Sequence, residues 1–241
     1  MQTIGLLGGM SWESSAVYYK LINEGVRARL GGLHSAKVVL WSAEFQDVAA
    51  KQAAGDWQAL LGIMIEGASA LERSGADMLL ICTNTMHKLA DQVAAAISIP
   101  IVHIADIAAA AIKLTPSRRP LLLATRFTME EPFYRGRMLE RHGLDLVRPE
   151  PEEERAVHDI IYRELCQGVV EPGSKARCLD IIAAARRRGA DGVILGCTEL
   201  DLLLSQADSD LPVFDTTALH AAAAVELAVA GHPAAALTRT A

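Results

Sequence analysis

The sequence has few aromatic residues, no excess of basic residues and no apolar run long enough to cross a bilayer. Aromatic residues make up 5% of the 241 residues, whereas alanine and leucine are abundant. This composition is typical of an α/β protein with many packed helices. The net charge of −6, without a basic stripe, argues against a nucleic-acid partner. The lack of a long apolar run argues against a membrane-spanning protein.

Cysteine and histidine patterns typical of metal sites are also missing. The four cysteines, Cys82, Cys166, Cys178 and Cys197, show no CxxC spacing, and no HExxH pattern occurs among the seven histidines. We therefore expect no metal site. The N-terminus, MQTIGLLGG, has neither a basic region nor a cleavage site, so we expect a cytoplasmic protein with reduced thiols.

One segment occurs twice, once in each half of the chain. Residues 75–84 read GADMLLICTN, and residues 189–199 read GADGVILGCTE. Each contains an apolar run without alternation, which is typical of a strand covered on both faces. The carboxyl ends of such parallel strands are where α/β proteins bind their ligands. The two copies therefore predict two similar halves that contribute strand ends to one site.

The order of the predicted elements also repeats. Apolar runs predict strands at residues 3–7, 37–41, 78–82, 101–104, 121–124, 144–147, 193–196 and 212–214. Helical patterns lie between them, whereas residues 44–55 are interpreted as a polar connection. A second pair of similar segments, IPIVHIADIAAAAI and LPVFDTTALHAAAA, supports an internal duplication.

This alternation predicts an α/β fold with two pseudo-symmetric, doubly wound parallel-sheet lobes and an active-site cleft between them. The N-terminal lobe is expected to contain residues 1–99 and a returning C-terminal helix within residues 215–241. The C-terminal lobe is expected to contain residues 100–214.

The register of the repeat decides which side chains share a position. When the two GAD segments are aligned, Cys197 is matched by Thr83 and not by Cys82. Because side chains alternate between the faces of a strand, Thr83 is expected to face the cleft as Cys197 does. A bulge at the strand end could instead turn the Cys82 side chain towards the cleft. The alternative for either cysteine is a small, buried apolar residue.

Several polar groups lie at equivalent strand ends. Residues 8–11, GGMS, form a glycine turn before a helix, where free N–H groups favour an anion, although a simple tight turn fits equally well. This turn is neither a GxGxxG nor a Walker motif, so it does not indicate a dinucleotide. Asn84, Thr85, Thr125 and Thr128 are further donors, which could hold a carboxylate or cap the next helix.

Five motifs together resemble the aspartate/glutamate racemase family over nearly the whole chain. They are IGLLGGMSWES, LGGLHSA, CTNTMHK, LPVFDT and GCTEL. The sequence is most similar to the bacterial branch of broad-specificity or L-aspartate/glutamate-specific amino-acid racemases. The resemblance implies two pseudo-symmetric lobes, an isomerase that needs neither pyridoxal phosphate nor metal, and a homodimer. It also implies two residues that act in turn as base and acid at the substrate Cα.

Some of the family's site positions are filled here by the same type of residue, and others are not. Cys197, in GCTE, takes the position of one base. The family motif Cys-Asn-Thr places Thr83 at the position of the other base, with Cys82 as the alternative. A lysine typical of aspartate racemases is replaced by Cys166, and the arginine expected near residues 41–47 is absent. Both serve the side-chain carboxylate of the substrate, so their absence argues against strict aspartate specificity.

The remaining expected site residues would bind the substrate. They are Met10, Ser11, Gln52, Asn84, Thr85, Thr125, Thr128, Thr198 and Glu199. Because a threonine hydroxyl is a much weaker acid than a thiol, we expect a slow enzyme with unequal bases. The alternatives are another cleft-cysteine reaction, such as hydantoin racemisation, maleate isomerisation or arylmalonate decarboxylation, and a non-catalytic carboxylate binder.

Overall fold

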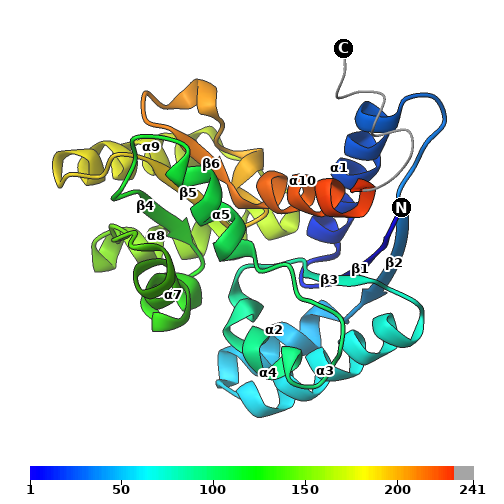
Figure 1. The fold of residues 1–241 in the computed structure, drawn as a ribbon. Coiled ribbons are helices and arrows are strands. Elements are labelled where there is room, and N and C mark those ends of the chain that lie inside the picture. The colour runs from blue at the N-terminus through cyan, green and yellow to red at the C-terminus, as the bar shows by residue number, and fades with distance from the viewer. Residues whose placement is uncertain (231–241) are drawn as a thin grey trace. The chain divides into compact units, whose positions relative to one another are not determined.

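The computed structural model describes residues 1–230, which form two compact units (Figure 1). Unit 1 contains Met1–His103 and the helical segment that starts at His220, whereas unit 2 contains Ile104–Leu219. Residues 231–241, which the sequence analysis assigned to the N-terminal lobe, lie outside the described residues.

Unit 1 is built on a three-stranded parallel sheet with the order β2-β1-β3. The central strand β1 (Thr3–Gly8) pairs with β2 (Lys37–Ser42) on one side and with β3 (Met78–Ile81) on the other. All four residues of β3 are buried, because apolar side chains cover both of its faces. Leu7 pairs with Ile81, so β1 and β3 end beside each other.

The helices of unit 1 follow its strands. They are α1 (Trp12–Leu30), α2 (Phe45–Ala54), α3 (Trp57–Arg73), the 3₁₀ helix η1 (Thr85–Leu89) and α4 (Ala90–Ala94). The interpretation of residues 44–55 as a polar connection is wrong, because most of them form α2. The Glu44 carboxylate caps this helix by accepting hydrogen bonds from two backbone N–H groups, and Gly55 ends it in the left-handed conformation.

Unit 2 also has a three-stranded parallel sheet, with the order β4-β5-β6. Its strands are β4 (Leu121–Ala124), β5 (Val193–Gly196) and β6 (Val213–Asp215). Its helices are α5 (Ile104–Lys113), α6 (Arg126–Glu130), α7 (Pro132–His142), α8 (Pro151–Arg163), η2 (Leu165–Gln167), α9 (Pro172–Arg187), η3 (Leu200–Leu202) and η4 (Gln206–Asp208). The parallel sheet in each half confirms the predicted α/β class.

Two predicted strands are wrong. Residues 101–104 and 144–147 each contribute only an isolated bridge, from Ile101 to Leu79 and from Val147 to Leu121. In the first segment the pairing stops because Ile104 already begins helix α5. In the second, Pro149 and Pro151 follow at once and lack the backbone N–H that further pairing needs.

Helix α10 (Thr216–Val229) starts after β6 and is anchored in unit 1 from His220 onward. His220 is fully buried, with Nε2 2.7 Å from the Val102 carbonyl oxygen and Nδ1 2.8 Å from the Tyr18 hydroxyl. Because a carbonyl only accepts, Nε2–H donates to Val102. Nδ1 of the neutral ring then accepts from Tyr18. Burial lowers the pKa of His220 to about 4, which keeps the ring neutral at pH 7.

Replacing Tyr18 with phenylalanine should destabilise unit 1. Tyr18→Phe leaves His220 Nδ1 buried without its donor, which we expect to lower the free energy of unfolding by about 1–3 kcal/mol. Urea unfolding measures this loss. The matched control is Tyr19→Phe on the same helix, because Tyr19 is exposed and its change should cost less than ~0.5 kcal/mol. Equal stability of the two variants would contradict the assigned hydrogen bond.

The buried neutral imidazole should also make stability depend on pH. Unfolding returns His220 to its ordinary pKa of about 6.5, so the unfolded chain binds a proton that the folded chain does not. The free energy of unfolding should therefore fall as the pH drops from about 6.5 towards 4, by on the order of 3 kcal/mol from this group. Urea unfolding at several pH values measures it. His220→Gln should show a shallower fall over this range, and an identical slope would count against the buried neutral histidine.

Candidate active site

The first set of predicted site residues follows strand β5 in unit 2. Cys197 comes directly after the strand and is only 8% exposed. Its Sγ lies 3.0 Å from Glu199 Oε2, and the Thr198 hydroxyl lies 2.7 Å from the same oxygen. Because an ionised carboxylate only accepts, both the thiol and the hydroxyl donate to Glu199. The structure thus brings Cys197, Thr198 and Glu199 together around one carboxylate oxygen.

The surroundings of Cys197 keep its proton on sulfur. Burial raises the pKa of the thiol well above its ordinary value, and the nearby Glu199 charge raises it further. The pKa of Asp201 is raised to about 6 by burial and by Asp215 and Glu199, and burial also raises the pKa of Asp215. The carboxyl end of β5 is therefore acidic, and a thiolate forms there only when a nearby group accepts its proton.

An aromatic group near Cys197 was not identified from the sequence. Burial, followed by the possible charges of Cys197, Cys166 and Glu199, raises the pKa of Tyr162. The Tyr162 ring lies 4.7 Å from the ring of His158. Tyr162 and His158 are four residues apart on α8, a spacing that the sequence analysis treated only as a helical pattern. The neighbourhood of Cys197 thus includes the Tyr162 phenol and the Cys166 thiol, and the His158 imidazole lies beside that phenol.

Thr125 and Thr128 lie at the same sheet edge as Cys197. Ala124 pairs with Gly196, so Thr125 and Cys197 are the residues that follow two neighbouring strands. Both threonines are buried, and their hydroxyl oxygens are 3.3 Å apart. Thr125 precedes α6, but its side chain makes no capping hydrogen bond to that helix.

The second set of predicted residues follows β3 in unit 1. Cys82 is fully buried, and its Sγ lies 3.9 Å from the carbonyl oxygen of Leu80. Burial raises the pKa of this thiol far above its ordinary range. Thr83, the next residue, is partly exposed. Of the two candidates for the first-half base, Thr83 is therefore the more accessible.

The other predicted residues of unit 1 lie around the ends of β1 and β3. Met10 and Ser11 follow β1, and the Ser11 side chain caps α1 by accepting from the Ser14 N–H at 3.2 Å. Asn84 and Thr85 follow β3 and are buried. Gln52 reaches the same region from α2, since its Nε2 lies 3.2 Å from the sulfur of Met86. The donors predicted for a carboxylate thus gather at one sheet edge of this unit.

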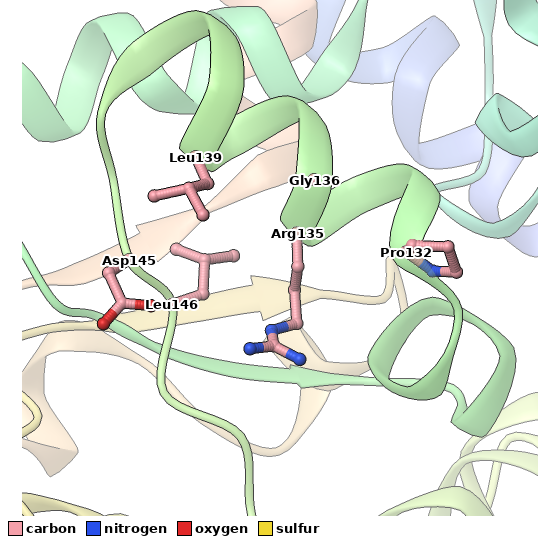
Figure 2. Close-up of a pocket in the computed structure, with 6 residues that line it drawn as sticks. All are labelled: Pro132, Arg135, Gly136, Leu139, Asp145 and Leu146. Atoms are coloured by element: carbon pink, nitrogen blue, oxygen red, sulfur yellow. The ribbon is translucent and has the colours of Figure 1, made fainter.

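A separate surface pocket lies in unit 2, with a volume of about 180 Å³. Figure 2 shows Arg135 reaching down from α7 into it, beside Leu146. It is lined by Pro132, Arg135, Gly136, Leu139, Asp145 and Leu146. None of the predicted site residues lines this pocket, so we do not assign it to the candidate active site.

Metal and membrane sites are not found in residues 1–230. No three histidine, cysteine or acidic side chains of this part of the chain are arranged to hold a metal ion. None of the described helices is both long enough and apolar enough to cross a membrane.

Removing the charge of Glu199 should make Cys197 easier to ionise. In a Cys166→Ser background, Glu199→Gln should lower the apparent pKa of the Cys197 thiol, because it removes a neighbouring negative charge. The measurement is the rate of alkylation by iodoacetamide against pH, with the Cys197 peptide quantified by mass spectrometry. Asp201→Asn is the control, because Asp201 makes no hydrogen bond to the thiol in the described chain, and its shift should be smaller. An unchanged profile in Glu199→Gln would contradict the assigned pair.

Comparisons with known proteins show the family to which the chain belongs. The family model described as Asp/Glu/Hydantoin racemase matches residues 7–224. The broad specificity amino-acid racemase RacX of Bacillus subtilis (strain 168) is 24% identical over 158 residues, which is 64% of this chain. The match spans 66% of that relative, just under two thirds of its length.

Two solved structures match almost end to end. A candidate Asp/Glu racemase from Yersinia pestis is 46% identical with a TM-score of 0.89, covering 95% of this chain and 100% of that one. An aspartate racemase homologue from Pyrococcus horikoshii OT3 is 35% identical with a TM-score of 0.82, covering 95% and 99%. The family expected from the sequence motifs is confirmed: the chain belongs to the Asp/Glu/hydantoin racemase family of isomerases.

Proposed function

We propose that this racemase interconverts the L- and D-forms of an amino acid without a cofactor. Cys197 handles the Cα proton on one side of the substrate, and Thr83 handles it on the other. The observation that carries the proposal is the 3.0 Å hydrogen bond from the Cys197 thiol to the Glu199 carboxylate. A buried thiol that donates to a carboxylate has a local acceptor for its proton, which is what a thiol base needs.

The Cys197 side of the reaction takes three steps. Cys197 first gives its proton to Glu199, which leaves a thiolate beside a neutral carboxylic acid. The thiolate then removes the Cα proton and becomes a thiol again. The electron pair left at Cα spreads into the substrate carboxylate as an enediolate. Donors aimed at that carboxylate stabilise the growing charge, and the candidates for this role are Met10, Ser11, Asn84, Thr85 and Thr198.

The Thr83 side completes the inversion. Its hydroxyl gives a proton to the opposite face of Cα and recovers one from water, and Glu199 returns to water the proton that it took from Cys197, so that every group ends in its starting state. Because a hydroxyl is a far weaker acid than a thiol, this half of the reaction is slow and the two turnover rates differ. The equilibrium constant of racemisation is one, so kcat/KM must still be equal in both directions. Cys82 is the weaker candidate, since its thiol is fully buried and donates to the Leu80 carbonyl.

The proposed substrate is aspartate, glutamate or a wider set of amino acids. A thiol, Cys166, stands where strict aspartate racemases are expected to have a lysine, and a charge on it would raise the pKa of Cys197. The similarity to the broad specificity amino-acid racemase of Bacillus subtilis supports a wider set of substrates. Gln52, Thr125 and Thr128 are proposed as further substrate contacts. Hydantoin racemisation is the second candidate, because the family description includes it and it needs the same proton transfer at a carbon beside a carbonyl group.

A homodimer and a cytoplasmic location are parts of the same proposal. Large apolar side chains, Trp12, Tyr19 and Leu40, are exposed on α1 and on the edge strand β2 of unit 1. Exposed apolar side chains of this kind are common at protein interfaces. Sedimentation equilibrium tests the dimer, and cell fractionation tests the location.

Substitutions at the three candidate bases test the proposed roles. In D2O with a panel of L- and D-amino acids and a 5-substituted hydantoin, Cys197→Ser should abolish deuterium exchange at Cα. Thr83→Cys should raise the inversion rate by about ten-fold or more, because it supplies a second acid of suitable pKa. Cys82→Ser is the matched control and should change the rate less than about three-fold, because a serine hydroxyl can also donate to the Leu80 carbonyl.

Mass spectrometry reports the deuterium, and chiral chromatography reports inversion. Exchange that survives in Cys197→Ser would contradict the proposed base. Ligand binding without exchange across the whole panel would instead favour a non-catalytic carboxylate binder. A larger loss from Cys82→Ser than from Thr83→Ala would reassign the first-half base to Cys82.

A further inference from the structure

His87 lies behind the peptide bond that joins Thr83 to Asn84. Its Nδ1 is 2.8 Å from the Thr83 carbonyl oxygen, and the residue is buried in η1. A carbonyl oxygen has no proton to give, so Nδ1–H of His87 must be the donor. The sequence analysis assigned this histidine no role.

This hydrogen bond fixes the direction of the neighbouring amide. The cis peptide of the described chain is Met10–Ser11, so the Thr83–Asn84 peptide is trans. In a planar trans peptide, the C=O and the N–H point in opposite directions. When His87 holds the Thr83 carbonyl, the Asn84 N–H must therefore point away from His87. A donor on the carbonyl also polarises the amide and strengthens its N–H as a donor.

The imidazole of His87 is itself held by two other histidines of unit 1. Its ring centroid lies 4.6 Å from that of His103 and 5.9 Å from that of His220. His220 is tied to Tyr18 and to the carbonyl of Val102, the residue before His103. The position of the His87 ring is thus set by η1, by the segment at residues 102–103 and by helix α10.

We propose that His87 is a positioning residue for the racemase reaction. It aims the Asn84 N–H at the substrate carboxylate, where negative charge grows as the Cα proton leaves. This inference rests on the proposed function, because it needs a carboxylate held at the end of β3. His87 itself does not touch the substrate.

A pair of variants with nearly equal shape tests this role. His87→Asn keeps an N–H donor close to the position of Nδ1, whereas His87→Leu has a similar size and no donor. Both lose the contacts of the imidazole ring with His103 and His220. We expect His87→Asn to keep kcat within about three-fold of the parent, and His87→Leu to lose about ten-fold or more in kcat with a smaller change in KM. Equal kcat values for the two variants would overturn the proposal.

Two controls separate this inference from the function on which it rests. Thermal unfolding of both variants sets an assay temperature well below either midpoint, so that a loosened fold does not lower kcat. If Cys197→Ser abolishes exchange but the two His87 variants have equal kcat, only the role of His87 is wrong. If exchange survives in Cys197→Ser, the proposed reaction itself is wrong. Should His87→Leu not fold, His87→Ala replaces it, with the same ten-fold loss expected.

Discussion

The hydrogen bond between the Cys197 thiol and the Glu199 carboxylate determines which of these two groups in unit 2 holds their shared proton. At 3.0 Å, and almost closed off from water, the pair holds one proton between two groups that would otherwise repel each other as anions. Burial and the carboxylate both oppose a permanent thiolate. In the proposed mechanism, the same carboxylate takes the proton when the thiol acts as a base. Strand β5 matters because its apolar, fully buried run delivers Cys197 to this acidic edge of the sheet.

Unit 1 has a strand, β3, that is similar to β5, but the residues that follow it carry different chemical groups. In β3 the apolar run continues into Cys82, whose thiol donates to the Leu80 carbonyl and is removed from water. The first partly exposed side chain is Thr83, one residue later. Because successive side chains point to opposite faces, this single step decides which group is accessible. In the proposed mechanism, the two halves therefore supply different proton-handling groups, and the weaker acid belongs to the half without a neighbouring carboxylate in its motif.

Much of the fold and part of the candidate site could be predicted from the sequence, and the features that were missed have physical causes. The buried strands were predicted because runs such as Val193–Gly196 are apolar without alternation. Helix α2 was missed because its composition is polar and a glutamate caps it in place of the commoner serine, threonine, aspartate or asparagine. The role of Glu199 as the partner of Cys197 was also missed, since it depends on how the chain turns after β5. Tyr162 and His87 were not assigned, although their partners His158 and Thr83 are only four residues away, because spacing alone does not show that Tyr162 lies near Cys197 or that the His87 ring meets the Thr83 carbonyl.

Helix α10 begins in unit 2 at Thr216 and belongs to unit 1 from His220 onward. At its start, the Thr216 hydroxyl donates to the carbonyl of Leu195, two residues before Cys197, at 2.7 Å. About one helical turn later, His220 accepts from Tyr18 and lies against the ring of His87, behind Thr83. Each contact lies inside its own unit. Thr216 is thus bonded to the strand that carries the thiol, and His220 is bonded to Tyr18 and packs against the histidine that holds the Thr83 carbonyl. A polar side chain at each end of that turn is what the sequence Thr-Thr-Ala-Leu-His supplies, and an apolar helix of the same length would anchor neither.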